Sequence, residues 1–377
     1  MFKKIFIFFC FIFIISEFVF ALNDINEIYN EQLHLSGMDK LTELLPKDSV
    51  KTLENMGIKN NDFNELSKLS PIKIFNETIK KTKEKFSSPM KSVSPVIAVI
   101  LLCAMIDSID FSLKKTKMSE IMSAIGSICI CTCIIGPIVE FIATTSGIIK
   151  AASEFIVCFI PIMVGIMLAS GQTVSASSYH MMMTGAGQII SYLCTGFLVP
   201  LMNTMLGIAT MSSITPRLKL NGLCGVIYRV IKSFLGISVS AFVSLLALQT
   251  LVASPTDNIG GKTAKLALSS FVPIVGSALG DACSTIQSCL KLLKSGAGVF
   301  GIIALGILFL PALVECMIWI FLLSTCSAAS DILSQGKISG LLRSISKVLQ
   351  ALMAIILSCV AVFIVSTVII LIIGSGG

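Results

Sequence analysis

The chain has 377 residues, of which 55% are hydrophobic and 13% are charged, and its mean hydropathy is +0.93. Because soluble domains carry about 25% charged residues, this composition excludes a soluble globular protein and predicts an integral membrane protein. The net charge of +7 comes from short basic clusters between apolar runs, a pattern that orients membrane proteins. It does not indicate binding to nucleic acid.

The first 21 residues predict a secretory signal peptide. A short basic start precedes an apolar run that ends at the small residue Ala21. We expect cleavage after Ala21. The alternative is an uncleaved anchor, because the apolar run is somewhat long and Glu17 interrupts its end. Residues 22–92 then predict a short extracytoplasmic helical segment, and residues 93–377 predict a polytopic membrane domain.

The membrane domain predicts an all-α protein with six to seven transmembrane helices. A helix needs about 20 apolar residues to cross a bilayer. One of the apolar segments, 155–170, is short and contains Pro161. The apolar segments are 93–110, 121–142, 155–170, 185–210, 234–253, 297–325 and 348–373.

An internal duplication relates about 121–233 to about 234–347. Phe-Ile-Pro-Ile at 159–162 matches Phe-Val-Pro-Ile at 271–274, and similar basic stretches close both units. Further matches follow in the same order at a near-constant offset, which one accidental similarity would not produce. The matched single residues are Pro161 and Pro273, Gly185 and Gly296, Gly187 and Gly298, and Pro200 and Pro311.

The distribution of basic residues predicts the orientation of the chain. Signal cleavage leaves residues 22–92 on the outer side, and basic loops prefer the cytoplasm. Only two crossings per unit satisfy this rule, so 155–170 and 262–294 should be re-entrant or interfacial elements on the outer side. Four lysines in the second element argue against that side: Lys262, Lys265, Lys291 and Lys294. The basic loops lie at 114–117, 211–233 and 326–347.

Two hypotheses explain the role of these proline elements and of the polar residues near them. They frame a pore mouth, or they only brace the bundle. Glu315 lies near the middle of its segment, where a carboxylate costs about 2.5–3.5 kcal/mol and should face the bundle or a cavity. Thr204, beside Asn203, is its repeat counterpart, and either residue could line a pore or tie helices together. The four repeated glycines are expected at close helix contacts. The candidate pore or helix-packing residues are Glu315, Thr204, Asn203, Pro161, Pro273, Gly185, Gly187, Gly296, Gly298, Pro200 and Pro311.

No pattern in the sequence predicts a catalytic, cofactor-binding or metal site. The cysteines of CICTC at 129–133 are spaced by two, which spreads them around a helix. The stretch TDNIGGKT at 256–263 ends like a phosphate-binding loop but lacks its first glycine and a preceding strand. We therefore expect a protein that is not an enzyme.

Two stretches carry a resemblance to a known family. They are TAKLALSSFVPIVGSALGDACSTIQSCLKLLKSGAGVFGI at 263–302 and PIMVGIMLASGQTVSAS at 161–177. With them, the chain resembles the stage III sporulation protein AE family of endospore-forming bacteria. The resemblance implies a multi-pass protein in the mother-cell membrane around the forespore. It also implies a secretion-like channel complex, with a secretion-type ATPase and intermembrane ring proteins as partners. It supplies no catalytic residues.

Three functions remain open from the sequence. The chain could be a conduit or export gate of that channel, a platform that organises its partners, or a self-contained small-molecule transporter. A transporter should show several intramembrane charges, whereas only Glu315 lies deep in a predicted span. The sequence therefore favours a subunit of the complex and does not separate conduit from platform.

Overall fold

The computed structural model describes residues 45–55, 87–113, 116–214, 221–271 and 276–372. All regular elements of these ranges are helices, which confirms the predicted all-α class. The predicted signal peptide and most of 22–92 lie outside the described residues. The helices are α2 (Lys47–Asn55), α5 (Ser87–Leu113), α6 (Thr116–Ala169), α7 (Thr173–Ser191), the π-helix η2 (Tyr192–Leu198), α8 (Val199–Ile214), α9 (Asn221–Phe271), α10 (Gly276–Ile332) and α11 (Gly336–Ile372).

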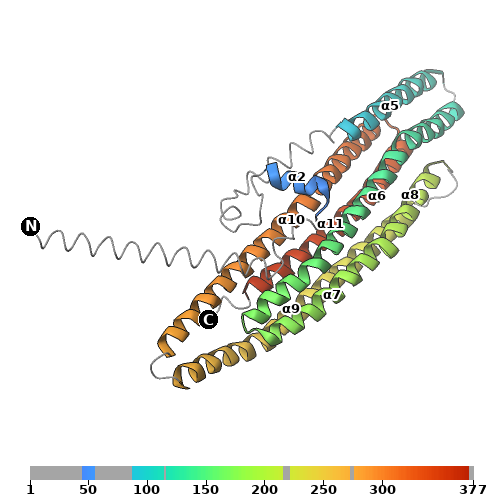
Figure 1. Ribbon diagram of the computed structural model, residues 1–377. Coiled ribbons are helices and arrows are strands. Elements are labelled where there is room, and N and C mark those ends of the chain that lie inside the picture. The colour runs from blue at the N-terminus through green and yellow to red at the C-terminus, as the bar shows by residue number, and fades with distance from the viewer. Residues whose placement is uncertain (1–44, 56–86, 114–115, 215–220, 272–275, 373–377) are drawn as a thin grey trace, which may run out of the picture.

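The long helices lie side by side in one elongated bundle (Figure 1). Six of the described helical stretches are long and apolar enough to cross a membrane. This number agrees with the six to seven helices that the sequence predicts. The six stretches are Pro89–Ser108, Ile121–Ala169, Thr173–Ser212, Gly222–Leu248, Ile286–Ile332 and Gly336–Val368.

The core of the bundle is built around α10 and α11, which pack against each other along most of their length. α11 also contacts α6, α8 and α9, so it is surrounded by other helices. Large aromatic rings fill the space between them: Phe309 of α10 and Phe363 of α11 have ring centroids 6.3 Å apart. Phe155 of α6 and Phe300 of α10 meet in the same way at 6.4 Å. These rings are fully buried and stabilise the bundle by excluding water or lipid from its axis.

The chain reverses direction at the two ends of the bundle (Figure 1). The connections α5–α6, α8–α9 and α10–α11 lie at one end, which we call the basic end because the predicted basic loops fall there. The turn at 170–172 and the connection between α9 and α10 lie at the opposite end. Each predicted repeat unit therefore contributes two long passes of the chain, as the distribution of basic residues requires.

Residues 155–170 do not form the separate re-entrant element that the sequence predicts. They are the last turns of α6, which continues without interruption through Pro137 and Pro161. A proline removes one helical hydrogen bond. Burial of neighbouring residues such as Phe159 and Met163 against the core holds the helix together despite that loss. The second predicted element, 262–294, is likewise divided between α9 and α10, and Pro273 lies outside the described residues.

The other pair of matched prolines also differs in its surroundings. Pro200 follows η2, in which the backbone widens into a π-helix. A π-helical stretch is a common way to accommodate a residue that cannot donate its own backbone hydrogen bond. Pro311 instead lies inside the continuous α-helix α10. The internal duplication stays a prediction, and the two copies differ in local geometry at Pro200 and Pro311.

Candidate functional site

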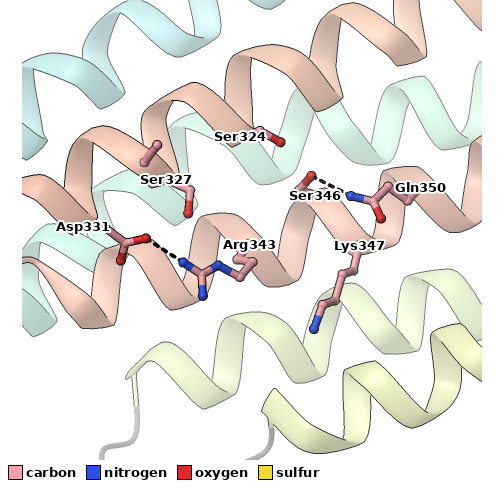
Figure 2. A pocket seen from close by; sticks show the side chains of 8 residues that line it. Ser324, Ser327, Asp331, Arg343, Ser346, Lys347 and Gln350 are labelled. Atoms are coloured by element: carbon pink, nitrogen blue, oxygen red, sulfur yellow. Dashed lines mark hydrogen bonds and ion pairs between the residues drawn. The ribbon is translucent and has the colours of Figure 1, made fainter.

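A polar pocket of about 240 Å³ lies between α10 and α11, close to the turn that joins them (Figure 2). Two hydrophobic helices form its walls, yet nearly all of its lining side chains are polar or charged. Such a concentration of polar groups on two predicted membrane helices indicates a site that binds something polar. The lining residues are Ser324, Ser327, Ala328, Asp331, Arg343, Ser346, Lys347 and Gln350.

Helical spacing explains why these residues converge. On α10, Ser324, Ala328 and Asp331 follow each other at intervals of four and three residues, which places them on one face. On α11, Arg343, Lys347 and Gln350 repeat the same spacing. Because the two helices run antiparallel from their common turn, the two polar faces meet along the pocket.

One charge pair closes the end of the pocket that lies nearest the turn. Arg343 donates a hydrogen bond to Asp331, with 2.6 Å between Nη2 and Oδ2. Both side chains are exposed by about half, so water screens the pair and it adds less than about 1 kcal/mol to stability. The pair nevertheless neutralises the single carboxylate of the lining.

Lys347 supplies the remaining charge of the pocket. Its side chain points away from Asp331, toward α8 and α9 (Figure 2). Its ammonium nitrogen would lie 3.9 Å from a Cβ atom on Gly225 near the start of α9. Across the part of the chain that the structure describes, no carboxylate lies within ion-pair distance of Lys347. The pocket is therefore cationic, and the hydroxyl groups of its serines and the amide of Gln350 are the neutral polar groups of its lining.

The turn between α10 and α11 is fixed by polar contacts of its own. Gln335, almost fully buried, donates through its side chain to Asp107 of α5 and through its backbone to the Ser330 carbonyl oxygen at 2.8 Å. Ser327 donates to the carbonyl oxygen of Ser339 across the helix pair at 3.2 Å. These contacts hold α5, α10 and α11 in register and keep the pocket walls apart at a defined distance.

The polar residues predicted at mid-span do not share one site. Glu315 is half-buried on α10, whereas Asn203 and Thr204 are exposed on α8. Thr204 donates to the carbonyl oxygen of Pro200 at 2.9 Å, which satisfies its hydroxyl within its own helix. α8 packs chiefly against α6, α9 and α11. The structure therefore does not bring Glu315 and its repeat counterpart together, and their role in a pore stays a prediction.

The structure gives the surroundings of two of the repeated glycines, and the close contacts predicted for Gly296 and Gly298 stay a prediction. A Cβ atom on Gly185 would meet nothing within 4 Å in this chain, so that prediction is wrong within the chain. Gly187 is buried at an ordinary distance of 3.8 Å from Val157. Gly296 and Gly298 are buried on α10. Gly126 has a closer contact than Gly185 or Gly187, because a Cβ atom there would lie 2.5 Å from the sulfur of Cys103.

The basic residues of the pocket stand out in the sequence, but their pattern there predicts a loop and not a helix face. The sequence predicts a basic loop at 326–347, which contains Arg343 and Lys347. In the structure only the short turn around Ser334 is non-helical, and both residues lie on α11. A helical reading of this stretch places the basic residues on one face, beside the serines of α10.

Comparisons with known proteins agree with the helical membrane architecture. The family model for stage III sporulation protein AE matches residues 52–374. The stage III sporulation protein AE of Bacillus subtilis (strain 168) is 22% identical over 258 residues, which cover 68% of this chain and 64% of that protein. No solved structure matches the chain. The chain therefore belongs to the stage III sporulation protein AE family and is a multi-pass membrane protein of sporulation.

Proposed function

We propose that the chain is a membrane subunit of the secretion-like channel complex between mother cell and forespore, placed in the mother-cell membrane around the forespore. The single observation that carries the proposal is the length of its apolar helices. Two of them, on α6 and α10, are longer than one bilayer can cover, so we infer that other protein chains cover the apolar surface that lies outside the lipid. That requirement fits a subunit of a larger assembly better than a self-contained transporter.

The mismatch in length is large. The apolar stretch Ile121–Ala169 of α6 has 49 residues, and Ile286–Ile332 of α10 has 47. At a rise of 1.5 Å per residue the first is about 74 Å long, compared with a hydrocarbon core of about 30 Å. Even a tilt of about 40° leaves it spanning about 57 Å along the membrane normal. Roughly half of the apolar length therefore extends beyond the lipid.

The outward face of α7 and of the start of η2 carries exposed apolar side chains that another protein chain would cover. Val174, Met181, Ile189 and Tyr192 lie on one stripe at helical spacing. All four are exposed, Met181 to 80% and Tyr192 to 74%. We call this stripe the α7 face. Exposed apolar surface of this kind outside lipid is a contact surface for another protein.

Gly185 lies on the same α7 face, between Met181 and Ile189. Open space surrounds it within the chain, so its small size serves no contact there. A glycine on an exposed apolar stripe lets a helix of another chain approach closely. We infer that the close contact expected for this glycine forms between subunits.

The two ends of the bundle fit different partners of the proposed complex. The basic end would face the mother-cell cytoplasm, where a secretion-type ATPase acts. The α7 face lies toward the opposite end, where ring-forming proteins between the two membranes would meet the chain. In this arrangement the chain works as an assembly platform, and a passage through the complex would form between subunits.

Gly185→Leu tests the proposal because it should separate folding from assembly. We expect the variant to accumulate and to unfold in detergent at the wild-type temperature, because the new side chain meets open space within the chain. Its recovery with the other channel proteins from sporulating cells should fall several-fold, and forespore development should fail. Immunoblotting after affinity purification measures the first effect, and spore counts measure the second.

Gly236→Leu is the matched control. Gly236 lies on α9 and is likewise surrounded by open space, but it is not part of the α7 face. This control should assemble and sporulate normally. If Gly185→Leu behaves like Gly236→Leu in both measurements, the α7 face contacts lipid and the proposed assembly surface is wrong.

A further inference from the structure

Exposed apolar side chains follow the polar pocket along the same two helices. On α10, Met317 and Phe321 precede Ser324 on the same face and are exposed to 56% and 70%. On α11, Leu357 and Ile364 follow Gln350 on the same helix face and are exposed to 47% and 37%. Cationic and hydroxyl groups thus lie near the α10–α11 turn, and apolar side chains extend from them toward the middle of the bundle.

We propose that this site binds an anionic phospholipid. Its phosphate would accept hydrogen bonds from Lys347 and from serine hydroxyls of the pocket, and its acyl chains would lie against Phe321 and Leu357. The inference needs only that the chain lies in a membrane and does not rest on its role in the channel complex.

Charge complementarity selects this occupant. Arg343 already neutralises Asp331, so the positive charge of Lys347 is left to attract an anion. Basic pockets between membrane helices at the cytoplasmic side are suited to phosphate headgroups. The pocket volume of about 240 Å³ accommodates a headgroup but not two acyl chains, which would lie outside it against the exposed apolar side chains.

Two other anions share part of this chemistry. A free phosphate would bind the polar groups and would make no contact with the exposed apolar side chains. An acidic segment of a partner protein would pair with the charge of Lys347, and no lipid would be involved. The lipid is favoured because exposed apolar side chains adjoin the polar groups on both helices, and only an amphiphile satisfies both surfaces at once.

The test uses the purified full chain in a neutral detergent and native mass spectrometry with phosphatidylglycerol and phosphatidylcholine as probes. The wild-type chain should bind phosphatidylglycerol more tightly than phosphatidylcholine. Lys347→Gln should weaken phosphatidylglycerol binding about fivefold, the expected effect of one lysine at an anionic surface, and leave phosphatidylcholine unchanged. Phe321→Asn should weaken both lipids, because it removes apolar contact.

Lys232→Gln is the matched control, since Lys232 is exposed on α9 near the same end and does not line the pocket. Binding of phosphatidylglycerol by this control should equal that of the wild type. Equal losses in Lys347→Gln and Lys232→Gln would overturn the proposal in favour of a general surface charge effect. Displacement of phosphatidylglycerol by inorganic phosphate would overturn it in favour of a free anion. Equal wild-type affinity for the two lipids would also overturn it, and would direct the search to acidic protein segments.

Discussion

Gly126→Ala should reduce the free energy of unfolding by about 1–3 kcal/mol, the usual range for overpacking a tight contact. Gly126 of α6 lies where α5 and α11 meet it, and an added Cβ atom would be 2.5 Å from the Cys103 sulfur and 3.2 Å from Cδ1 of Ile338. The short cysteine side chain has little freedom to move away. Thermal unfolding of the purified protein in detergent measures the change.

Two further variants locate the cause of that loss. Gly136→Ala changes the same helix at an exposed position with open space around it. It should therefore be neutral, or stabilising by up to about 1 kcal/mol through better helix propensity. Cys103→Ala combined with Gly126→Ala should recover most of the lost stability, because the clashing sulfur is gone. A double variant no more stable than Gly126→Ala alone would show that the sulfur is not the obstacle.

Gln172→Leu should reduce the free energy of unfolding by about 1.5–3 kcal/mol, the contribution of a hydrogen bond to a charged group. Gln172 lies in the turn between α6 and α7 and accepts a hydrogen bond from Lys294 of α10, with 2.9 Å between Oε1 and Nζ. Lys294 is only 5% exposed, so water compensates little for the lost acceptor.

The matched variants for this contact change the lysine. Lys294→Met removes the buried charge and keeps a similar volume, so adding it to Gln172→Leu should restore stability relative to Gln172→Leu alone. Lys291→Met, at an exposed position one turn earlier, should not restore it. The same thermal measurement compares them. Equal stability of Gln172→Leu and wild type would mean that the hydrogen bond contributes nothing to the fold.

The sequence predicted the parts of the fold that depend on composition and periodicity. The all-α class, the order of the long helices and the two passes per unit follow from apolar length and from the placement of basic residues. Lys294 had argued against an outer position for 262–294. Its buried contact with Gln172 removes the objection that Lys294 raises, because the positive-inside rule concerns lysines in loops and this lysine lies inside the bundle. The exposed Lys291 still argues against the outer side.

The remaining features depend on contacts between distant residues. Pro161 suggested a break, but burial of Phe159 and its neighbours keeps α6 continuous. Gly126 lies in no sequence motif, and its tight contact arises only because α5, α6 and α11 meet there. The polar pocket forms because Asp331 and Arg343 face each other across a short turn. The sequence predicts a long loop in place of that turn. Such pairings become visible only once the helices are placed.

The α7 face gives the most direct test of the claim that the chain is one subunit of a larger assembly. A photo-crosslinking amino acid at position 181, on that face, is compared in sporulating cells with one at position 237. Position 237 lies in the middle of Gly222–Leu248, a 27-residue stretch that one bilayer can cover. Our account predicts protein adducts at position 181 and none at position 237. An absence of protein adducts at position 181, with both positions labelling lipid alike, would contradict it.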